Sequence, residues 1–178
     1  NLQFHVQPIS TDILGATKMH NFDGITPTIA NIRPTSRGEI NITSNDSRDN
    51  PKIKMNYLST QDDRDVAAKA LKIVRKIMLE TEAFKKYDPE EYRPGIHITD
   101  DEELVKAGSE HAQTIFHPVG TCKMGQNDDS VVDEKLKVRG IENLRVIDAS
   151  IMPNITSGNT NAPTIMIAEK GADMILGK

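Results

Sequence analysis

Apolar and polar residues alternate along residues 1–9, with the period of two that is typical of a half-buried β-strand. The apolar side of this predicted strand carries Leu2, Phe4, Val6 and Ile9. Strands are also predicted at residues 25–33 and 39–43, because "PTSRG" between them contains residues that favour turns. We therefore expect these two strands to form a hairpin, followed by a polar loop and a further strand in "KIKMNYL".

The clearest helical pattern spans residues 59–81, and Ser59 or Thr60 is expected to cap this helix. Its apolar residues recur three and four positions apart and are Val66, Ala70, Leu71, Val74, Ile77 and Met78. A second helix is predicted from Thr99 to about Ala112, because a threonine followed three residues later by a glutamate is the capping-box pattern.

The last third of the chain combines short apolar pieces with one more helix. We expect short strands around "SVVD", "LKVRG" and "NLRVIDAS". Residues 161–176 are predicted to be helical, with Pro163 near the first turn and an apolar spacing formed by Ile165, Ala168, Ala172 and Ile175. Because strands and helices are mixed irregularly rather than as repeated βαβ units, the predicted fold class is α+β.

Composition narrows the choice of partners and compartment. Hydrophobic residues make up 37% of the chain and charged residues 27%, which is typical of a globular protein, and the net charge of -4 argues against a nucleic-acid partner. No apolar run reaches the ~20 residues of a membrane span. A single cysteine favours a reducing compartment, so we expect a cytoplasmic protein, at most peripheral to the inner membrane. Because the first residue is Asn1 rather than Met, we expect that the chain is cut from a longer protein.

The motif "HPVGTCKMG" contains the only cysteine of the chain, Cys122, together with His117. A nucleophilic thiol would need a base, and His117 and Lys123 are near in sequence, but no third orienting group is evident. A zinc site is not supported, because paired CxxC or HxxxH spacings are absent from the sequence. His117 itself can act as a general base, or it can be a structural histidine, and the residues alone leave these interpretations open.

A second candidate segment, "SGNTNAPT", places small residues and two asparagines immediately before the predicted C-terminal helix. It matches neither GxxxxGK[ST] nor GxGxxG, and both motifs are absent from the whole sequence. Backbone N–H groups and the dipole at a helix N-terminus nevertheless favour negative charge. We therefore expect an electron-rich group to bind there.

Three segments, taken in order, resemble the C-terminal part of the glucose-methanol-choline (GMC) oxidoreductases, which oxidise alcohols with FAD: "HPVGTCKMG", "VVDEKLKVRGIENLRVIDASIMP" and "SGNTNAPTIMIAEKGADMI". The likeness is closest to the bacterial choline and alcohol dehydrogenase branch. It implies that residues 1–115 form part of a substrate-binding domain with an antiparallel sheet and helices. Residues 116–178 would carry the active-site histidine motif and the C-terminal strands and helix that complete an FAD-binding domain, the rest of which is absent from this chain.

The resemblance also implies roles for single residues. His117 would be the base for the substrate hydroxyl, and Asn161 its hydrogen-bonding partner. The residues that would contact FAD are Asp148, Ala149, Ala162, Pro163 and Thr164, and no metal is implied. The expected partners are a primary alcohol or choline-like substrate, the N-terminal FAD-binding half of the same enzyme, and an electron acceptor that is either oxygen or a quinone.

One departure from the family pattern is the missing GxGxxG segment, which binds the ADP half of the cofactor in this family. We therefore expect weak or no FAD binding, and no turnover, by the chain alone. A non-catalytic module that kept the family's fold and binds a ligand is the alternative interpretation.

Overall fold

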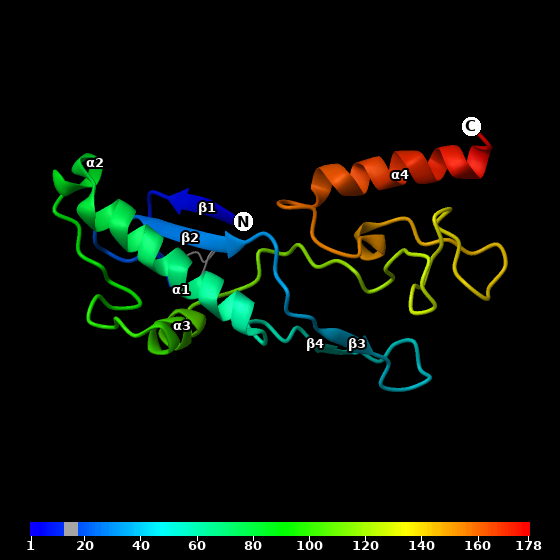
Figure 1. The fold of residues 1–178 in the computed structure, drawn as a ribbon, viewed down its shortest axis with the longest axis horizontal. Helices are drawn as coiled ribbons and strands as arrows, with labels where there is room; N and C mark the ends of the chain where they lie inside the picture. The colour runs from blue at the N-terminus through cyan, green and yellow to red at the C-terminus, as the bar shows by residue number, and fades with distance from the viewer. Residues whose placement is uncertain (13–17) are drawn as a thin grey trace. The chain divides into compact units, whose positions relative to one another are not determined.

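The chain is described by a computed structural model that covers residues 1–12 and 18–178. It divides into two compact units, the first formed by Asn1–Asn31 and Tyr57–Ile115 and the second by Ile32–Asn56 and Phe116–Lys178. Each unit contains helices and a small antiparallel sheet (Figure 1), which confirms the α+β prediction at this level. The division of function between residues 1–115 and 116–178 stays a prediction.

The sheet of the first unit pairs two strands that are far apart in the sequence. β1 (Leu2–Gln7) runs antiparallel to β2 (Thr26–Asn31) (Figure 1). In the second unit, β3 (Glu39–Asn41) pairs with β4 (Lys52–Lys54). The predicted hairpin between residues 25–33 and 39–43 is therefore wrong. "PTSRG" does not fold one strand back on the other, because the chain passes from the first unit to the second directly after Asn31.

The strand at the N-terminus is confirmed, but its apolar side is not the covered one. Phe4, Val6 and Ile9 are exposed, with Val6 at 60%. The polar residues on the opposite side are half-buried, and Nε2 of His5 and Oε1 of Gln7 are inaccessible to solvent without a hydrogen-bond partner among the described residues. The alternation of apolar and polar residues therefore predicted the strand. Which side of β1 is covered depends on its contacts in the folded unit.

The helices of the first unit begin at polar caps. α1 (Gln61–Arg75) is capped by Thr60, whose hydroxyl accepts a hydrogen bond from the Asp63 N–H at 3.3 Å, as the sequence predicted. α1 packs against β2 and against α3 (Asp101–Ser109). The cap of α3 is Asp100 rather than Thr99, so that prediction is wrong by one residue. The Asp100 carboxylate accepts from two first-turn N–H groups at 3.0 Å, and its charge also suits the positive helix end.

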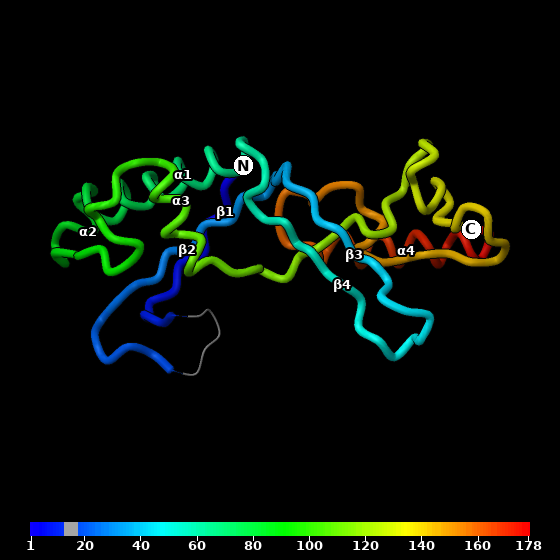
Figure 2. Tube along the Cα trace, turned by 90° about the horizontal axis from the view of Figure 1, so that it is seen from below, coloured from blue at the N-terminus to red at the C-terminus, as the bar shows by residue number. Residues whose placement is uncertain are grey.

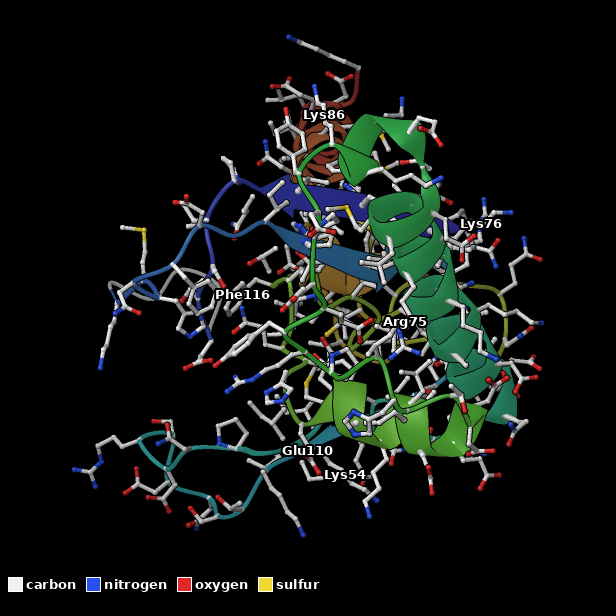
Figure 3. All side chains as sticks on the ribbon, turned by 90° about the vertical axis from the view of Figure 1, so that its left-hand side faces the viewer. Lys54, Arg75, Lys76, Lys86, Glu110 and Phe116 are labelled. Atoms are coloured by element: carbon white, nitrogen blue, oxygen red, sulfur yellow. The ribbon has the colours of Figure 1, made fainter. Side chains whose placement is uncertain are left out.

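The end of α1 is held by a buried ion pair. After α1 the chain makes a π-helical turn, η1 (Lys76–Glu80), and then a short helix, α2 (Glu82–Lys85). Arg75, the last residue of α1 (Figure 3), forms a bidentate pair with Glu91 at 2.7 and 2.9 Å. Its guanidinium also donates to the carbonyl oxygens of Ile98 and Gly95. The two charged side chains are only 14% and 10% exposed. Arg75 therefore ties the segment that contains Glu91 and Ile98 to the first unit's longest helix.

The second unit contains a compact apolar core and a short hairpin, β3–β4 (Figure 2). The core residues are Val132, Leu136, Ile151, Met152 and Ile167. The three strands predicted between residues 129 and 150 occur only as isolated bridges. The Asp133 carboxylate accepts hydrogen bonds from the N–H groups of Lys137 and Lys135, and the first of these bonds is the main reason that the pKa of Asp133 is lowered. This tight turn, with Leu136 in a left-handed conformation, interrupts an extended backbone, and Asn143 is a second left-handed position further along.

The C-terminal helix, α4 (Asn161–Leu176), has the predicted bounds and ends at Gly177 in a left-handed conformation. Its buried positions, Ile167 and Gly171, face the core of the second unit. The spacing that predicted the helix lies on another side, because Ile165, Ala168, Ala172 and Ile175 are all exposed. α4 thus carries two apolar sides, of which one is covered in this chain. Across residues 1–12 and 18–178, no helix is both long and apolar enough to cross a membrane.

Because Gly171 has no side chain, α4 can approach Ile147 closely. A Cβ atom at this position would lie 2.5 Å from Cγ2 of Ile147. We expect Gly171→Ala to lower the free energy of unfolding by ~1–3 kcal/mol, because the clash outweighs the gain in helix propensity. Thermal unfolding measures the change. Ile147→Ala in the same protein should remove part of the penalty, and a stabilising Gly171→Ala would contradict the close packing.

Candidate active site

The motif "HPVGTCKMG" is fastened to the core of the second unit by its backbone. The N–H of Cys122 donates to the Ser150 carbonyl at 3.0 Å, and that of Met124 to Ile151 at 2.8 Å. Gly120 has φ of +89°, and a Cβ atom there would lie 3.3 Å from the Met152 carbonyl oxygen. A glycine is therefore required by both conformation and space. The motif runs beside residues 150–152 and is held in place at several points.

His117 is half-buried and its ring contacts a hydroxyl group. Nδ1 of the imidazole lies 3.1 Å from Oγ1 of Thr160, a residue that is only 8% exposed. Phe116, immediately before it (Figure 3), has a left-handed φ of 62° and is 75% exposed. With Nδ1 engaged, Nε2 is the ring nitrogen that can act on a substrate. The geometry is thus suited to a base whose orientation is fixed from within the unit.

The N-terminus of α4 follows directly after Thr160. Thr160 occupies the cap position, but its side chain does not cap the helix. Its carbonyl oxygen accepts from both the N–H and the hydroxyl of Thr164, at 3.0 and 2.6 Å. Asn161 and Ala162 are exposed, and Pro163 has no N–H group. The first turn therefore presents the positive helix end beside two exposed residues, which suits an electron-rich ligand.

Asp148 and Ala149 lie at the start of a short 3-10 helix, η2 (Ala149–Ile151). One carboxylate oxygen of Asp148 accepts from the N–H of Ser150 at 2.8 Å and from its hydroxyl at 2.5 Å. Asp148 is exposed, while Ala149 packs against the core. Through Ser150 this turn is connected to the histidine motif. All the predicted site residues therefore belong to the second unit.

The thiol interpretation finds little support in this arrangement. Cys122 is half-buried, and the ammonium group of Lys123 is paired with the Asp129 carboxylate at 2.5 Å. This hydrogen bond, with the charge of Lys123, lowers the pKa of Asp129. The cation next to the cysteine in sequence is thus already neutralised, and the imidazole is bonded to Thr160. In the described part of the chain, His, Cys, Asp and Glu side chains form no group of three or more that could hold a metal ion.

Sequence reasoning missed Thr160. The structure places this residue, which is 43 positions away in the sequence, as a hydrogen-bond partner of His117. A hydroxyl residue at the start of a helix is typical of an N-cap, so its position in the sequence carried no signal for another role. The roles of Asn161 and of the other predicted residues stay predictions.

Comparison with known proteins decides the family. Residues 34–168 match the family described as GMC oxidoreductase, in its C-terminal domain. The chain belongs to the GMC oxidoreductase family. Among GMC oxidoreductase relatives, the oxygen-dependent choline dehydrogenase of Proteus mirabilis is 48% identical over 179 residues, covering 99% of this chain and 32% of the relative. That of Citrobacter koseri is 45% identical over 180 residues, covering 100% and 32%. The chain thus spans about a third of the length of these relatives.

Solved structures of GMC-type enzymes match the fold over nearly the whole chain. Pyridoxine 4-oxidase from Mesorbium loti superimposes with a TM-score of 0.83 at 30% identity, covering 96% of this chain and 32% of that one. A formate oxidase variant from Aspergillus oryzae gives a TM-score of 0.82 at 30% identity, covering 93% and 29%. The predicted family is confirmed, and the mixed α+β fold is that of the C-terminal part of these enzymes.

Proposed function

We propose that this chain is the C-terminal part of an FAD-dependent alcohol dehydrogenase that oxidises the CH–OH group of a primary alcohol or choline-like substrate. The observation that carries the proposal is the pairing of a fixed imidazole, His117, with an uncapped helix N-terminus that begins at Asn161. The choline dehydrogenases among the relatives support the substrate class. The remaining two thirds of the enzyme would supply the rest of the cofactor site.

The residues of the second unit fit the part of FAD that the resemblance assigns to them. The exposed first turn of α4 can receive an electron-rich ring edge at Ala162, Pro163 and Thr164. The helix dipole favours negative charge there by ~0.3–1 kcal/mol when exposed and up to ~2 kcal/mol when partly buried. Asp148 and Ala149 would contact the ribityl and diphosphate part of FAD. When bound, FAD supplies the acceptor for the hydride.

The protein's own groups prepare the substrate for oxidation. An alcohol carbon releases hydride more easily as the hydroxyl proton leaves, so a base is needed within ~3 Å of that oxygen. We assign this role to Nε2 of His117. Asn161 would donate a hydrogen bond to the developing alkoxide, which stabilises the charge as it forms. The two roles are complementary, because one group removes a proton and the other stabilises the oxygen left behind.

The exposed apolar side of α4 supports the proposal that this chain is part of a larger protein. Ile165 and Ile175 are 55% and 59% exposed, and with Ala168 and Ala172 they form a continuous stripe along the helix. Such a stripe is costly to leave in water. We assign it to packing against the N-terminal FAD-binding half. The same half would complete the substrate pocket, and it would carry the contacts for an electron acceptor, oxygen or a quinone.

The proposal is tested by mixing FAD with the chain alone and with the full-length enzyme. We expect weak or no binding by the chain, because most cofactor contacts lie in the other half, and a yellow, choline-oxidising full-length protein. Absorbance in the flavin region measures the bound FAD, and the bleaching of this absorbance on addition of choline measures the oxidation. A purified chain that is yellow and bleaches on addition of an alcohol would contradict the proposed division. A full-length protein that binds FAD but oxidises no alcohol would favour the non-catalytic module.

Cys122 provides a test that separates the flavoenzyme from a thiol enzyme. In the proposed function the thiol only packs, so Cys122→Ser should retain most of the alcohol oxidation rate. Alkylation of Cys122 by iodoacetamide should likewise leave the alcohol oxidation rate of the wild-type enzyme largely unchanged. The serine variant should respond to the reagent in the same way as the wild-type enzyme. Loss of activity in Cys122→Ser with normal FAD content would support the thiol mechanism instead.

A further inference from the structure

We propose that Thr160 is a positioning residue for His117, whose hydroxyl group holds the imidazole at Nδ1 in the orientation that leaves Nε2 for the substrate. The inference rests on the proposed function of His117. It is carried by the 3.1 Å contact between Thr160 Oγ1 and His117 Nδ1, which joins residues 43 positions apart in the sequence.

The side chain of Thr160 is used in an unusual way for its place in the fold. Threonine at the start of a helix ordinarily accepts a hydrogen bond from a first-turn N–H group. Here the side chain makes no such cap, and the hydroxyl is bonded to His117 instead. α4 therefore begins without the stabilisation of a side-chain cap, while the imidazole gains a partner.

Thr160 is also rigidly held, as a positioning group must be. The residue is 8% exposed, so its side chain has little freedom. Its carbonyl oxygen accepts two hydrogen bonds from Thr164, one from the N–H at 3.0 Å and one from the hydroxyl at 2.6 Å. Ser157 and Gly158, just before it, have positive φ angles that shape a tight turn. The backbone of Thr160 is thus tied to the first turn of α4 and follows directly after this turn.

The chemistry of imidazole defines what the contact does. A base that acts through Nε2 must have that nitrogen unprotonated, so the single proton of the neutral ring must lie on Nδ1. Nδ1–H can then donate to Oγ1 of Thr160. When Nε2 takes the substrate proton, Nδ1–H remains a donor and the same hydrogen bond is kept. Thr160 thereby keeps the ring in one orientation throughout the proton transfer, because its hydroxyl oxygen can accept from Nδ1–H both before and after Nε2 takes the proton.

The test compares Thr160→Val, which removes the hydroxyl but keeps the shape, with Thr160→Ser, which keeps the hydroxyl. Both are made in the full-length enzyme and assayed with choline. We expect kcat of the valine variant to fall about tenfold, the rate equivalent of one lost hydrogen bond, with KM nearly unchanged. The serine variant should stay close to wild type. An equal loss of kcat in the two variants, or no loss of kcat in Thr160→Val, would overturn the proposal.

A double-mutant cycle asks whether Thr160 acts through His117. In the His117→Ala background, Thr160→Val should cause no further loss of the residual activity. A further tenfold loss in that background would show an effect independent of the imidazole and would overturn the proposal. Should Thr160→Val fail to fold, as judged by its thermal transition, Thr160→Cys replaces it with the same expected results, because a thiol is only a weak hydrogen-bonding group.

A readout that needs no turnover is the chemical reactivity of His117. Diethyl pyrocarbonate modifies unprotonated imidazole nitrogens, and peptide mass spectrometry compares His117 with the exposed His97 as an internal reference. We expect modification at Nε2 of His117 to slow in Thr160→Val relative to His97, because a ring that is no longer held at Nδ1 can turn Nε2 away from the reagent. An unchanged ratio would overturn the positioning role. Failure of the base assignment would be seen separately, as a His117→Ala enzyme with undiminished alcohol oxidation.

Discussion

Replacing His117 by alanine in the full-length protein is expected, on the proposed function, to lower kcat/KM for choline by about 10²- to 10⁴-fold, the usual contribution of a positioned general base. Nδ1 of the imidazole lies 3.1 Å from the Thr160 hydroxyl, and the proposed function assigns the substrate proton to Nε2. Without it the hydroxyl proton must pass to water, and the hydride leaves a neutral alcohol less readily. Steady-state oxidation of choline, followed through reduction of an artificial acceptor, measures the change.

The matched control is His97→Ala, at an exposed histidine in the first unit. This variant should keep wild-type turnover. FAD content and the thermal transition should be the same in both variants, so that the loss belongs to the chemical step. A His117→Ala enzyme with normal flavin content and unchanged alcohol oxidation would refute the assignment of the base.

Replacing Glu91 by alanine is expected to have the largest effect on stability in the first unit. The carboxylate makes two hydrogen bonds to Arg75 and also accepts from the N–H of Gly95 at 3.0 Å. Its removal leaves a guanidinium that is 14% exposed without its counter-ion. Breaking a buried pair in this way costs ~3–5 kcal/mol. Urea unfolding followed by circular dichroism measures the loss, and hydrogen exchange should show it first in residues 91–98.

Glu82→Ala removes the carboxylate of an exposed ion pair and serves as the control. Glu82 bonds to Lys85 at 2.7 Å, but its side chain is 88% exposed. Surface pairs of this kind contribute less than ~1 kcal/mol. Equal losses in the two variants would mean that burial does not govern the Arg75–Glu91 pair. The loss of unfolding free energy in Glu91→Gln should lie between those of Glu91→Ala and Glu82→Ala, because an amide keeps some of the hydrogen bonds without the charge.

Local patterns were sufficient for most of the regular elements. α4 has its predicted bounds, because an uninterrupted apolar spacing with a proline in the first turn has no competing structure. α1 begins at its predicted cap for a similar reason. The short strands between residues 129 and 150 failed, because an Asx-type turn at Asp133 stops an extended segment that apolar content alone would favour. The hairpin after β2 failed because turn residues indicate that a chain bends, and not which strand it then meets.

The family and the candidate residues were likewise accessible from the sequence. "HPVGTCKMG" and "SGNTNAPT" are long motifs, and the family they indicated is confirmed by the match over residues 34–168. The partner of His117 was not accessible. Thr160 has the residue type and position of an ordinary cap, and its hydroxyl turns toward the imidazole only when the loop before α4 packs beside the histidine motif.

The sequence by itself determined the positions of the main helices and of β1, which family the chain belongs to, and which imidazole is the candidate base, because each depends on neighbouring residues or on long local motifs. The tertiary structure alone decided that the polar side of β1 is the less exposed one, that Arg75 pairs with Glu91, and that Thr160 contacts His117. Each of these contacts joins residues far apart in the chain or depends on which surface is covered. Their energies arise from burial and from hydrogen-bond geometry, which exist only once the units have folded.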